Sequence, residues 1–175
     1  KEFGNIYSRL GNPTVGALEA RLTALEEGAM CVALASGTSA VMYSLINIMS
    51  QGDNFVTASQ LYGGTYTMFD NILPEYGINS KKVDITDLEA VEAAIDEKTR
   101  AIYCETITNP GLVVADISAL ADIAHSKGIP LIVDATFTTS AILKPFEYGA
   151  DIVVYSLTKW MSGHGRVIAG AVIEK

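Results

Sequence analysis

Short, continuous apolar runs alternate along the chain with longer stretches in which apolar residues recur every three or four positions. The runs predict strands, most of them buried, at residues 30–35, 55–58, 79–83, 100–104, 131–133, 152–155 and 167–173. The longer stretches predict helices at residues 13–27, from the turn at Ser36 to about 50, from Tyr62 to just before Pro74, and at 87–96 and 117–128. Strands and helices therefore alternate along the whole chain.

This alternation predicts a single α/β domain with a mostly parallel sheet and helices on both faces of it. Ligands of such sheets bind where the carboxyl ends of the strands gather. The residues at those ends are therefore the candidates for a site: Ser36, Gly37, Thr38, Tyr62, Asn109, Asp134, Ser156, Thr158 and Lys159.

Lys159 follows the apolar run 152–155 at the start of a loop that also contains hydroxyls and glycines. A lysine at the mouth of a buried strand is expected to be desolvated on one side, which favours the neutral amine that attacks a carbonyl. Most single lysines are instead solvated surface charges. A reactive amine is thus a hypothesis that depends on the other candidates.

Three of those candidates have complementary chemistry. Ser36-Gly37-Thr38 stands between a strand and a helix, where free N–H groups attract an anion, although a capped turn also explains it. Asp134 ends an apolar run, so its carboxylate needs a cation or several donors; a turn aspartate is an equal alternative. Tyr62 offers a face for a flat ring, or is a tyrosine half in the core.

The remaining candidates are ambiguous when taken alone. Ser156 and Thr158 flank Leu157, so that in extended chain both hydroxyls face one side and can hold the same phosphate. Asn109 precedes a proline and is an ordinary turn residue unless its amide faces the site. Together the groups suit one ligand with an anion, a flat ring, a ring nitrogen and an aldehyde, and pyridoxal phosphate has all of these.

The composition narrows the classes of function. Of the 175 residues, 49% are apolar and 18% charged, which indicates strands buried on both faces or a large surface covered by a partner. The net charge of −8 argues against a nucleic-acid ligand. No apolar run reaches the roughly 18 residues of a membrane span, and no signal sequence is recognised, so we expect a cytoplasmic protein without membrane contact. Cys31 and Cys104 lie in apolar runs and are expected to be buried free thiols, with no metal site.

A series of spaced motifs covers nearly the whole chain: Tyr7-Ser8-Arg9 with Asn12-Pro13-Thr14, Ser36-Gly37-Thr38-Ser39-Ala40, Tyr62-Gly63-Gly64-Thr65, Glu105-Thr106 with Asn109-Pro110, Asp134-Ala135-Thr136-Phe137, and Ser156-Leu157-Thr158-Lys159 with Gly163-His164-Gly165. In this order they resemble the Cys/Met-metabolism family of pyridoxal-phosphate-dependent enzymes. The stretch from Gln60 to Tyr66 is most similar to the O-acetylhomoserine sulfhydrylases of that family.

The resemblance implies a fold and an assembly. Residues 13–175 would form the cofactor-binding large domain of an aspartate-aminotransferase-like, type I fold, with the last strand antiparallel. Residues 1–12 would reach a neighbouring subunit of a homodimer or homotetramer. A smaller C-terminal domain, which carries an arginine for the substrate carboxylate in the family, is expected to be absent from this chain.

The resemblance also implies a role for each candidate. Lys159 would bind the cofactor aldehyde and later move protons on the substrate, Asp134 would keep the ring nitrogen protonated, and Tyr62 would stack on the ring. Asn109 would lie near the ring hydroxyl. The phosphate would be held by Gly37, Thr38, Ser156 and Thr158 and by Tyr7 and Arg9 of a neighbouring subunit.

The implied reaction is γ-replacement on O-acetylhomoserine, in which sulfide or a thiol replaces the acetoxy group to give homocysteine or methionine. Two alternatives stay open: a methionine or cystathionine γ-lyase on the same scaffold, and a non-catalytic cofactor-binding fragment. The segment 163–168 leans towards γ-lyases, whereas Gly64 stands where methionine γ-lyases generally carry cysteine. Ala135 and Tyr155 stand where the family usually has asparagine and histidine, and no role is assigned to His164 or Arg166.

Overall fold

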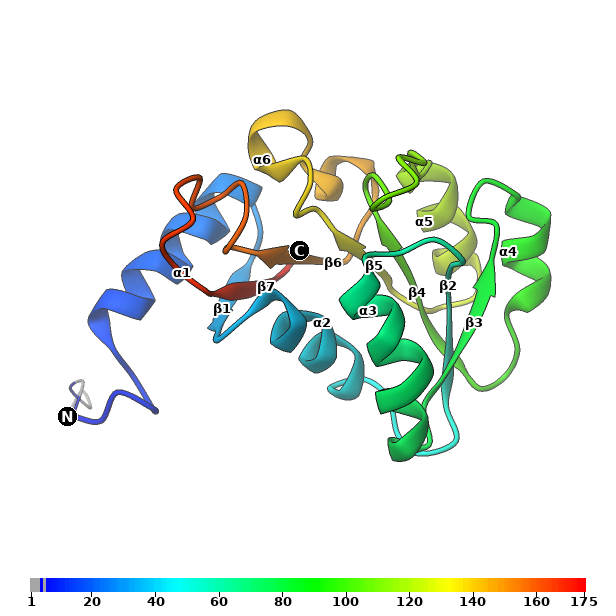
Figure 1. The fold of residues 1–175 in the computed structure, drawn as a ribbon, viewed down its shortest axis with the longest axis horizontal. Coiled ribbons are helices and arrows are strands. Elements are labelled where there is room, and N and C mark those ends of the chain that lie inside the picture. Colours follow the sequence, from blue (N-terminus) through cyan, green and yellow to red (C-terminus); the bar gives the residue numbers. More distant parts are fainter. Residues whose placement is uncertain (1–3, 5) are drawn as a thin grey trace.

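The computed structural model describes residue 4 and residues 6–175, and its centre is one sheet of seven strands (Figure 1). The strands lie in the order β1-β7-β6-β5-β4-β2-β3. Their bounds are Met30–Leu34 (β1), Asn54–Ala58 (β2), Asn79–Val83 (β3), Thr99–Glu105 (β4), Leu131–Asp134 (β5), Ile152–Ser156 (β6) and Gly170–Glu174 (β7).

The sheet is mostly parallel, as predicted. Strands β3, β2, β4, β5 and β6 pair in parallel with their neighbours, whereas β7 pairs antiparallel with both β6 and β1. The predicted antiparallel last strand is therefore confirmed. It follows β6 without a crossover helix, and a short return connection can only place a neighbouring strand antiparallel.

Helices cover both faces of the sheet. They are α1 (Pro13–Glu26), α2 (Gly37–Ile46), α3 (Gly63–Thr67), α4 (Leu88–Ala94), α5 (Ile117–Ser126) and α6 (Thr139–Ile142). Figure 1 shows α2 and α3 on one face, and α1, α4 and α5 belong to the other. Helices α1, α2, α4 and α5 begin with a side-chain cap, because the side chains of Asn12, Ser36, Asp87 and Asp116 each accept hydrogen bonds from N–H groups of the first turn.

Some boundaries differ from the sequence prediction. Helix α3 continues through a π-helical turn, Met68–Ile72, into a 3-10 turn, Leu73–Tyr76, so the helical path does not end before Pro74. A proline is accepted there because it stands in the first turn of the 3-10 segment, where its missing N–H has no partner to lose. Helix α2 ends at Ile46 rather than near residue 50, and β7 begins at Gly170 rather than 167.

The central strands form the core, whereas the β1 edge is open. All five residues of β2 are buried, but Met30 and Val32 on β1 are 55% and 46% exposed. On α1, Leu22 is buried, whereas Leu18 remains 41% exposed. The prediction of a buried strand at residues 30–35 is therefore wrong for this chain, because β1 lies at the edge of the sheet.

Two expectations from the composition can be checked directly. Cys31 and Cys104 are buried free thiols, as predicted, and burial raises the pKa of each to about 12. Both therefore stay protonated and unreactive at neutral pH. In the part of the chain that the structure describes, no helix is long and apolar enough to cross a membrane.

Glu26 is buried in the structure, although a carboxylate at a helix end usually faces water. Only 1% of its surface is exposed, and its Oε1 accepts a hydrogen bond of 2.5 Å from the hydroxyl of Tyr155 on β6. Among the described residues, its Oε2 has no hydrogen-bond partner. Burial therefore raises the pKa of Glu26 above the ordinary 4.5, and the hydrogen bond from Tyr155 opposes this shift.

The Glu26–Tyr155 pair predicts a pH-dependent stability. Because the folded pKa of Glu26 is raised, its contribution to stability is fully present below pH 4.5 and is lost as the pH rises through the folded pKa. The Tyr155→Phe variant leaves the carboxyl without its donor, so we expect the free energy of unfolding to fall by about 2–4 kcal/mol at pH 8 and by about 1 kcal/mol at pH 4. Urea unfolding at the two pH values measures both losses.

The matched control is the double variant Tyr155→Phe/Glu26→Leu, which removes both polar groups. Apolar replacement of a whole buried pair is close to neutral, so this variant should recover most of the stability at pH 8. Equal losses for Tyr155→Phe at both pH values would contradict the account.

Candidate active site

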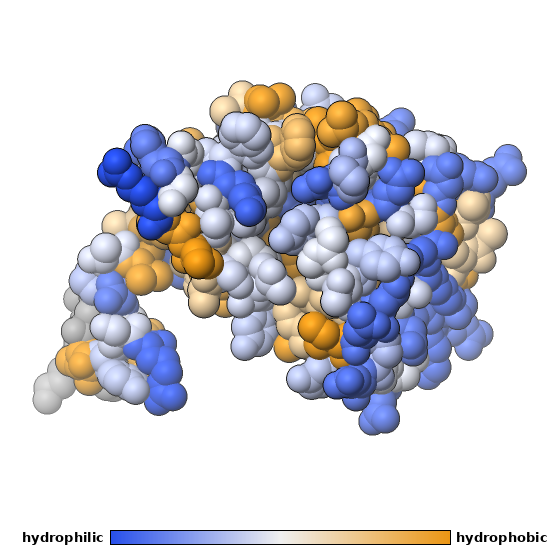
Figure 2. Space-filling view, viewed as in Figure 1, coloured by the Kyte–Doolittle hydropathy of each residue, from blue (hydrophilic) through white to orange (hydrophobic). Residues whose placement is uncertain are grey.

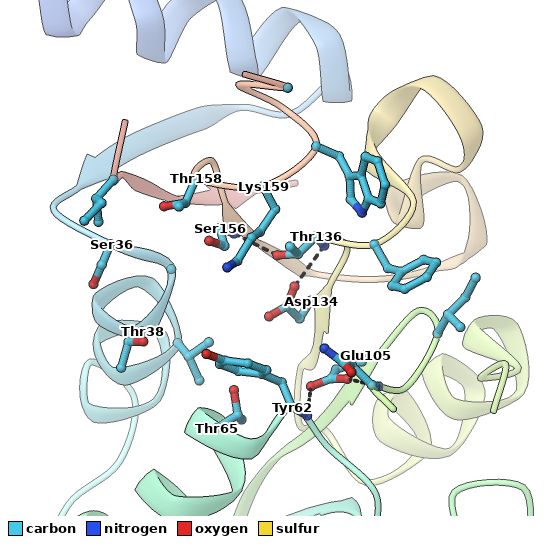
Figure 3. Close-up of a pocket in the computed structure, with 18 of the residues that line it drawn as sticks. Ser36, Thr38, Tyr62, Thr65, Glu105, Asp134, Thr136, Ser156, Thr158 and Lys159 are labelled. Carbon is cyan, nitrogen blue, oxygen red and sulfur yellow. Dashed lines mark hydrogen bonds between the residues drawn. The ribbon is translucent and has the colours of Figure 1, made fainter. Parts of the chain in front are cut away.

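A cavity of about 710 Å³ opens at the carboxyl ends of the strands, where the sequence predicted a site (Figure 3). Every strand-end candidate contributes to its wall: Ser36, Gly37, Thr38, Tyr62, Asn109, Asp134, Ser156, Thr158 and Lys159. The fold thus brings together residues that lie far apart in the sequence.

One end of the cavity is formed by the start of α2. Ser36 caps this helix, because its hydroxyl accepts a hydrogen bond of 3.0 Å from the N–H of Ser39. A β-carbon at Gly37 would lie 2.4 Å from the Cβ of Ser156, so only glycine lets the helix start approach the end of β6 so closely. Main-chain N–H groups of the first helical turn and the Ser156 side chain therefore meet at one point, which suits an anion.

The loop after β6 carries the lysine. The main-chain N–H of Ser156 donates to the hydroxyl of Thr136 at 2.7 Å, which fixes the end of the strand. The hydroxyl of Thr158 donates to the carbonyl of Ala169 at 3.2 Å and accepts the N–H of the same residue at 3.1 Å. These contacts hold the loop on either side of Lys159, whose amine points into the cavity in Figure 3.

Lys159 is exposed in this chain, and its predicted desolvation on one side stays a prediction. The neighbouring apolar strand does bury Val153, Val154 and Tyr155, but the loop turns the side chain of Lys159 into the open cavity. Its position in the cavity, and not burial by this chain, is what makes it a candidate nucleophile.

Asp134 stands at the end of β5, in the wall of the cavity. Its Oδ1 accepts the N–H of Thr136 at 2.9 Å, and its Oδ2 accepts the hydroxyl of buried Tyr103 at a longer 3.3 Å. Burial raises the pKa of Asp134, and the two hydrogen bonds oppose the shift. A carboxylate with few donors in such a place is stabilised by a cation brought by a ligand.

Tyr62 precedes α3, and its ring borders the cavity while remaining 47% exposed. The ring lies against Gly64, where a β-carbon would come within 2.7 Å of the Cε1 atom of Tyr62. The bare glycine therefore permits this ring orientation. An accessible aromatic face in the wall of the cavity suits a planar ligand.

Glu105 is a site residue to which the sequence analysis assigned no role. It ends β4, is 6% exposed, and accepts two main-chain N–H groups: that of Tyr62 at 2.7 Å on Oε1 and that of Asn109 at 3.0 Å on Oε2. Its pKa is raised to about 7, first by burial and further by the charge of Asp134. Its position at a strand end was a signal available in the sequence.

Tyr7 and Arg9 do not reach this cavity. They lie in the N-terminal segment, both exposed, with the Arg9 guanidinium 5.1 Å from the centre of the Tyr7 ring. Figure 2 shows this segment projecting from the body of the molecule. Their predicted contact with the phosphate of a neighbouring subunit stays a prediction, because a single chain cannot test it.

Comparison with known proteins agrees with this geometry. The protein-family model described as Cys/Met metabolism PLP-dependent enzyme matches residues 1–175. An O-acetyl-L-homoserine sulfhydrylase of Leptospira meyeri is 47% identical over 174 residues, which cover 99% of this chain and 39% of that protein. An L-methionine gamma-lyase of Fusobacterium nucleatum is 44% identical over 176 residues, which cover 100% of this chain and 45% of that protein.

A solved structure shares the fold. The crystal structure of a protein described as an O-acetylhomoserine (thiol)-lyase of Campylobacter jejuni contains N'-pyridoxyl-lysine-5'-monophosphate. It matches with a TM-score of 0.96 and 44% identity, covering 99% of this chain and 43% of that one. The present chain thus spans about two fifths of the length of the relatives that it matches.

The close approach at Gly37 predicts a selective loss of anion binding. In Gly37→Ala the new methyl group collides with Ser156, so either α2 or the end of β6 must shift. We expect the dissociation constant of pyridoxal phosphate to rise by about tenfold or more, since each 1.4 kcal/mol of lost interaction is a factor of ten. Gly63→Ala is the matched control, because nothing lies within 4 Å of a β-carbon there. Equal affinity in both variants would contradict the predicted anion site.

Proposed function

The chain belongs to the Cys/Met-metabolism family of pyridoxal-phosphate-dependent enzymes, and on that basis we propose that its cavity binds pyridoxal phosphate and that the whole protein carries out γ-replacement on O-acetylhomoserine. The second substrate is sulfide or a small thiol, and the product is homocysteine or methionine. The observation that carries the proposal is the meeting of Lys159, Asp134 and Tyr62 around one cavity with an anion site at its end.

The residues present fit this cofactor. The start of α2, where Gly37 leaves no room for a β-carbon, provides the main-chain N–H groups of Gly37 and Thr38 for the phosphate, with the hydroxyls of Ser156 and Thr158 in the same wall. Asp134 supplies the negative charge for the ring nitrogen, and the Tyr62 ring supplies the stacking face. When bound, the cofactor withdraws electrons from the substrate α-carbon, which no protein side chain can do.

The proposal assigns a role to each of the main site residues. Lys159 holds the cofactor through its aldehyde and, once its amine is free, takes protons from the substrate carbons and returns them. Asp134 keeps the proton on the ring nitrogen by charge. Asn109 orients the ring through the hydroxyl beside the aldehyde. Thr136 links two site residues, because its N–H donates to the carboxylate of Asp134 and its hydroxyl accepts the N–H of Ser156.

The residue at position 64 supports γ-replacement over γ-elimination, because the resemblance implies that methionine γ-lyases generally carry cysteine where Gly64 stands. The Tyr62 ring occupies the space into which a side chain at residue 64 would project, since a β-carbon there would lie 2.7 Å from the ring. A cysteine at this position, as in methionine γ-lyases, would force the ring to move. The similarity to the L-methionine gamma-lyase of Fusobacterium nucleatum keeps elimination as the second candidate.

The assembly and the location are further parts of the proposal. Tyr7 and Arg9 extend from the projecting N-terminal segment to the phosphate of a neighbouring subunit in a homodimer or homotetramer. The exposed apolar residues on the β1 edge, among them Met30 and Val32, suit a surface that is covered in such an assembly. The whole protein acts on small molecules in the cytoplasm.

The reaction is tested with the full-length protein. O-acetylhomoserine and sulfide should yield homocysteine, whereas 2-oxobutyrate formed without an added thiol would show a γ-lyase. Lys159→Ala should lower the turnover number by at least about 10²–10⁴, the range typical for loss of a positioned proton donor and acceptor. Lys98→Ala, which alters an exposed lysine outside the cavity, is the control and should retain the wild-type rate.

Two results would overturn the proposed function. Wild-type turnover in Lys159→Ala would remove Lys159 from the chemistry. If the cofactor-loaded wild-type protein shows no turnover, the protein binds the cofactor without being an enzyme.

A further inference from the structure

Glu105 connects two loops that reach the cavity from different parts of the chain. Its Oε1 accepts the N–H of Tyr62, in the connection between β2 and α3, at 2.7 Å. Its Oε2 accepts the N–H of Asn109, in the connection between β4 and α5, at 3.0 Å. One carboxylate at the end of β4 therefore fixes the main chain at two residues that face the same cavity (Figure 3).

The charge of Glu105 is unfavourable where it stands. The carboxylate is 6% exposed, and in the pairing of β4 with β5 it lies directly beside Asp134, a second carboxylate. Burial and this neighbouring charge both raise its pKa, and the two main-chain N–H groups oppose the shift. A neutral side chain would avoid the repulsion. Only the ionised carboxylate, however, offers two acceptor oxygens and no donor, so the two N–H groups favour that form.

A glutamine at this position shows why both oxygens matter. Its amide oxygen can accept one of the two N–H groups, but its NH₂ group then faces the other as donor against donor. The loop of Tyr62 or that of Asn109 would lose its anchor. If the loop of Tyr62 is released, its main chain is no longer fixed, and the ring is no longer held against Gly64.

We propose that Glu105 is a positioning residue, which holds the Tyr62 ring and the Asn109 amide in the orientation that the cofactor ring requires by accepting both main-chain N–H groups. This inference rests on the proposed function, because it takes pyridoxal phosphate as the planar ligand. Glu105 itself acts through Tyr62 and Asn109 and takes no part in the chemical step.

The test measures cofactor binding in the full-length protein. Apoprotein is titrated with pyridoxal phosphate, and binding is followed by the change in tryptophan fluorescence, to which Trp160 in the cavity wall contributes. Glu105→Gln should raise the dissociation constant about tenfold to a hundredfold, the loss expected for a hydrogen bond to a charged group. Circular dichroism of the bound cofactor should also weaken per bound molecule, since it reports how the ring is held.

A double-variant cycle separates positioning from general stabilisation. If Glu105 acts mainly by holding the Tyr62 ring, most of its effect disappears when the ring is absent, so Glu105→Gln should cost less than about threefold in a Tyr62→Ala background. Glu105→Asp keeps the charge, but its side chain is one methylene too short to reach both loops. This variant replaces Glu105→Gln in the test if the latter fails to fold, and it should bind pyridoxal phosphate several-fold more weakly than the wild type. Glu97→Gln, the same change at an exposed residue just before β4, is the control and should bind like the wild type.

The outcomes are distinct. Wild-type affinity and dichroism in both Glu105 variants would overturn the inference, and so would losses that multiply fully both with that of Tyr62→Ala and with that of Asn109→Ala. Failure of the wild-type protein itself to bind pyridoxal phosphate would overturn the proposed function, and this inference with it.

Discussion

The close approach of the α2 start to the end of β6 is the constraint on which the site depends. It is possible because Gly37 has no side chain at the contact with Ser156. A second glycine serves the same junction, since a β-carbon at Gly170 on β7 would lie 2.0 Å from the carbonyl oxygen of Ser36. With β7 and the α2 start packed this closely around β6, the lysine loop that joins β6 to β7 must open over the cavity.

The electrostatics of the cavity follow from this arrangement. Parallel pairing of β4 with β5 sets Glu105 and Asp134 side by side at the carboxyl ends of these two strands, where burial raises the pKa of both. Two neighbouring carboxylates of this kind are stabilised by positive charge in the cavity. A protonated ring nitrogen supplies such a charge, so the cavity is suited to a ligand that carries one.

The sequence predicts those features that depend on the pattern of neighbouring residues. Apolar runs located the strands, and their alternation with helices led to a parallel sheet whose carboxyl ends hold the candidate residues. Features that depend on tertiary distance were not predictable in this way. The burial of Glu26 depends on the Tyr155 hydroxyl, the role of Glu105 depends on two N–H groups from separate loops, and the exposure of Lys159 depends on the direction of its loop. For Glu105, its place at a strand end was a partial signal.

The central claim is that Lys159 forms the covalent bond to pyridoxal phosphate, and reductive trapping tests it most directly. Purified full-length protein is treated with borohydride and digested, and the modified peptide is identified by mass spectrometry. The account predicts a phosphopyridoxyl group on the peptide that contains Lys159, together with loss of the label in Lys159→Ala. Label on another lysine, or undiminished label in Lys159→Ala, would contradict it.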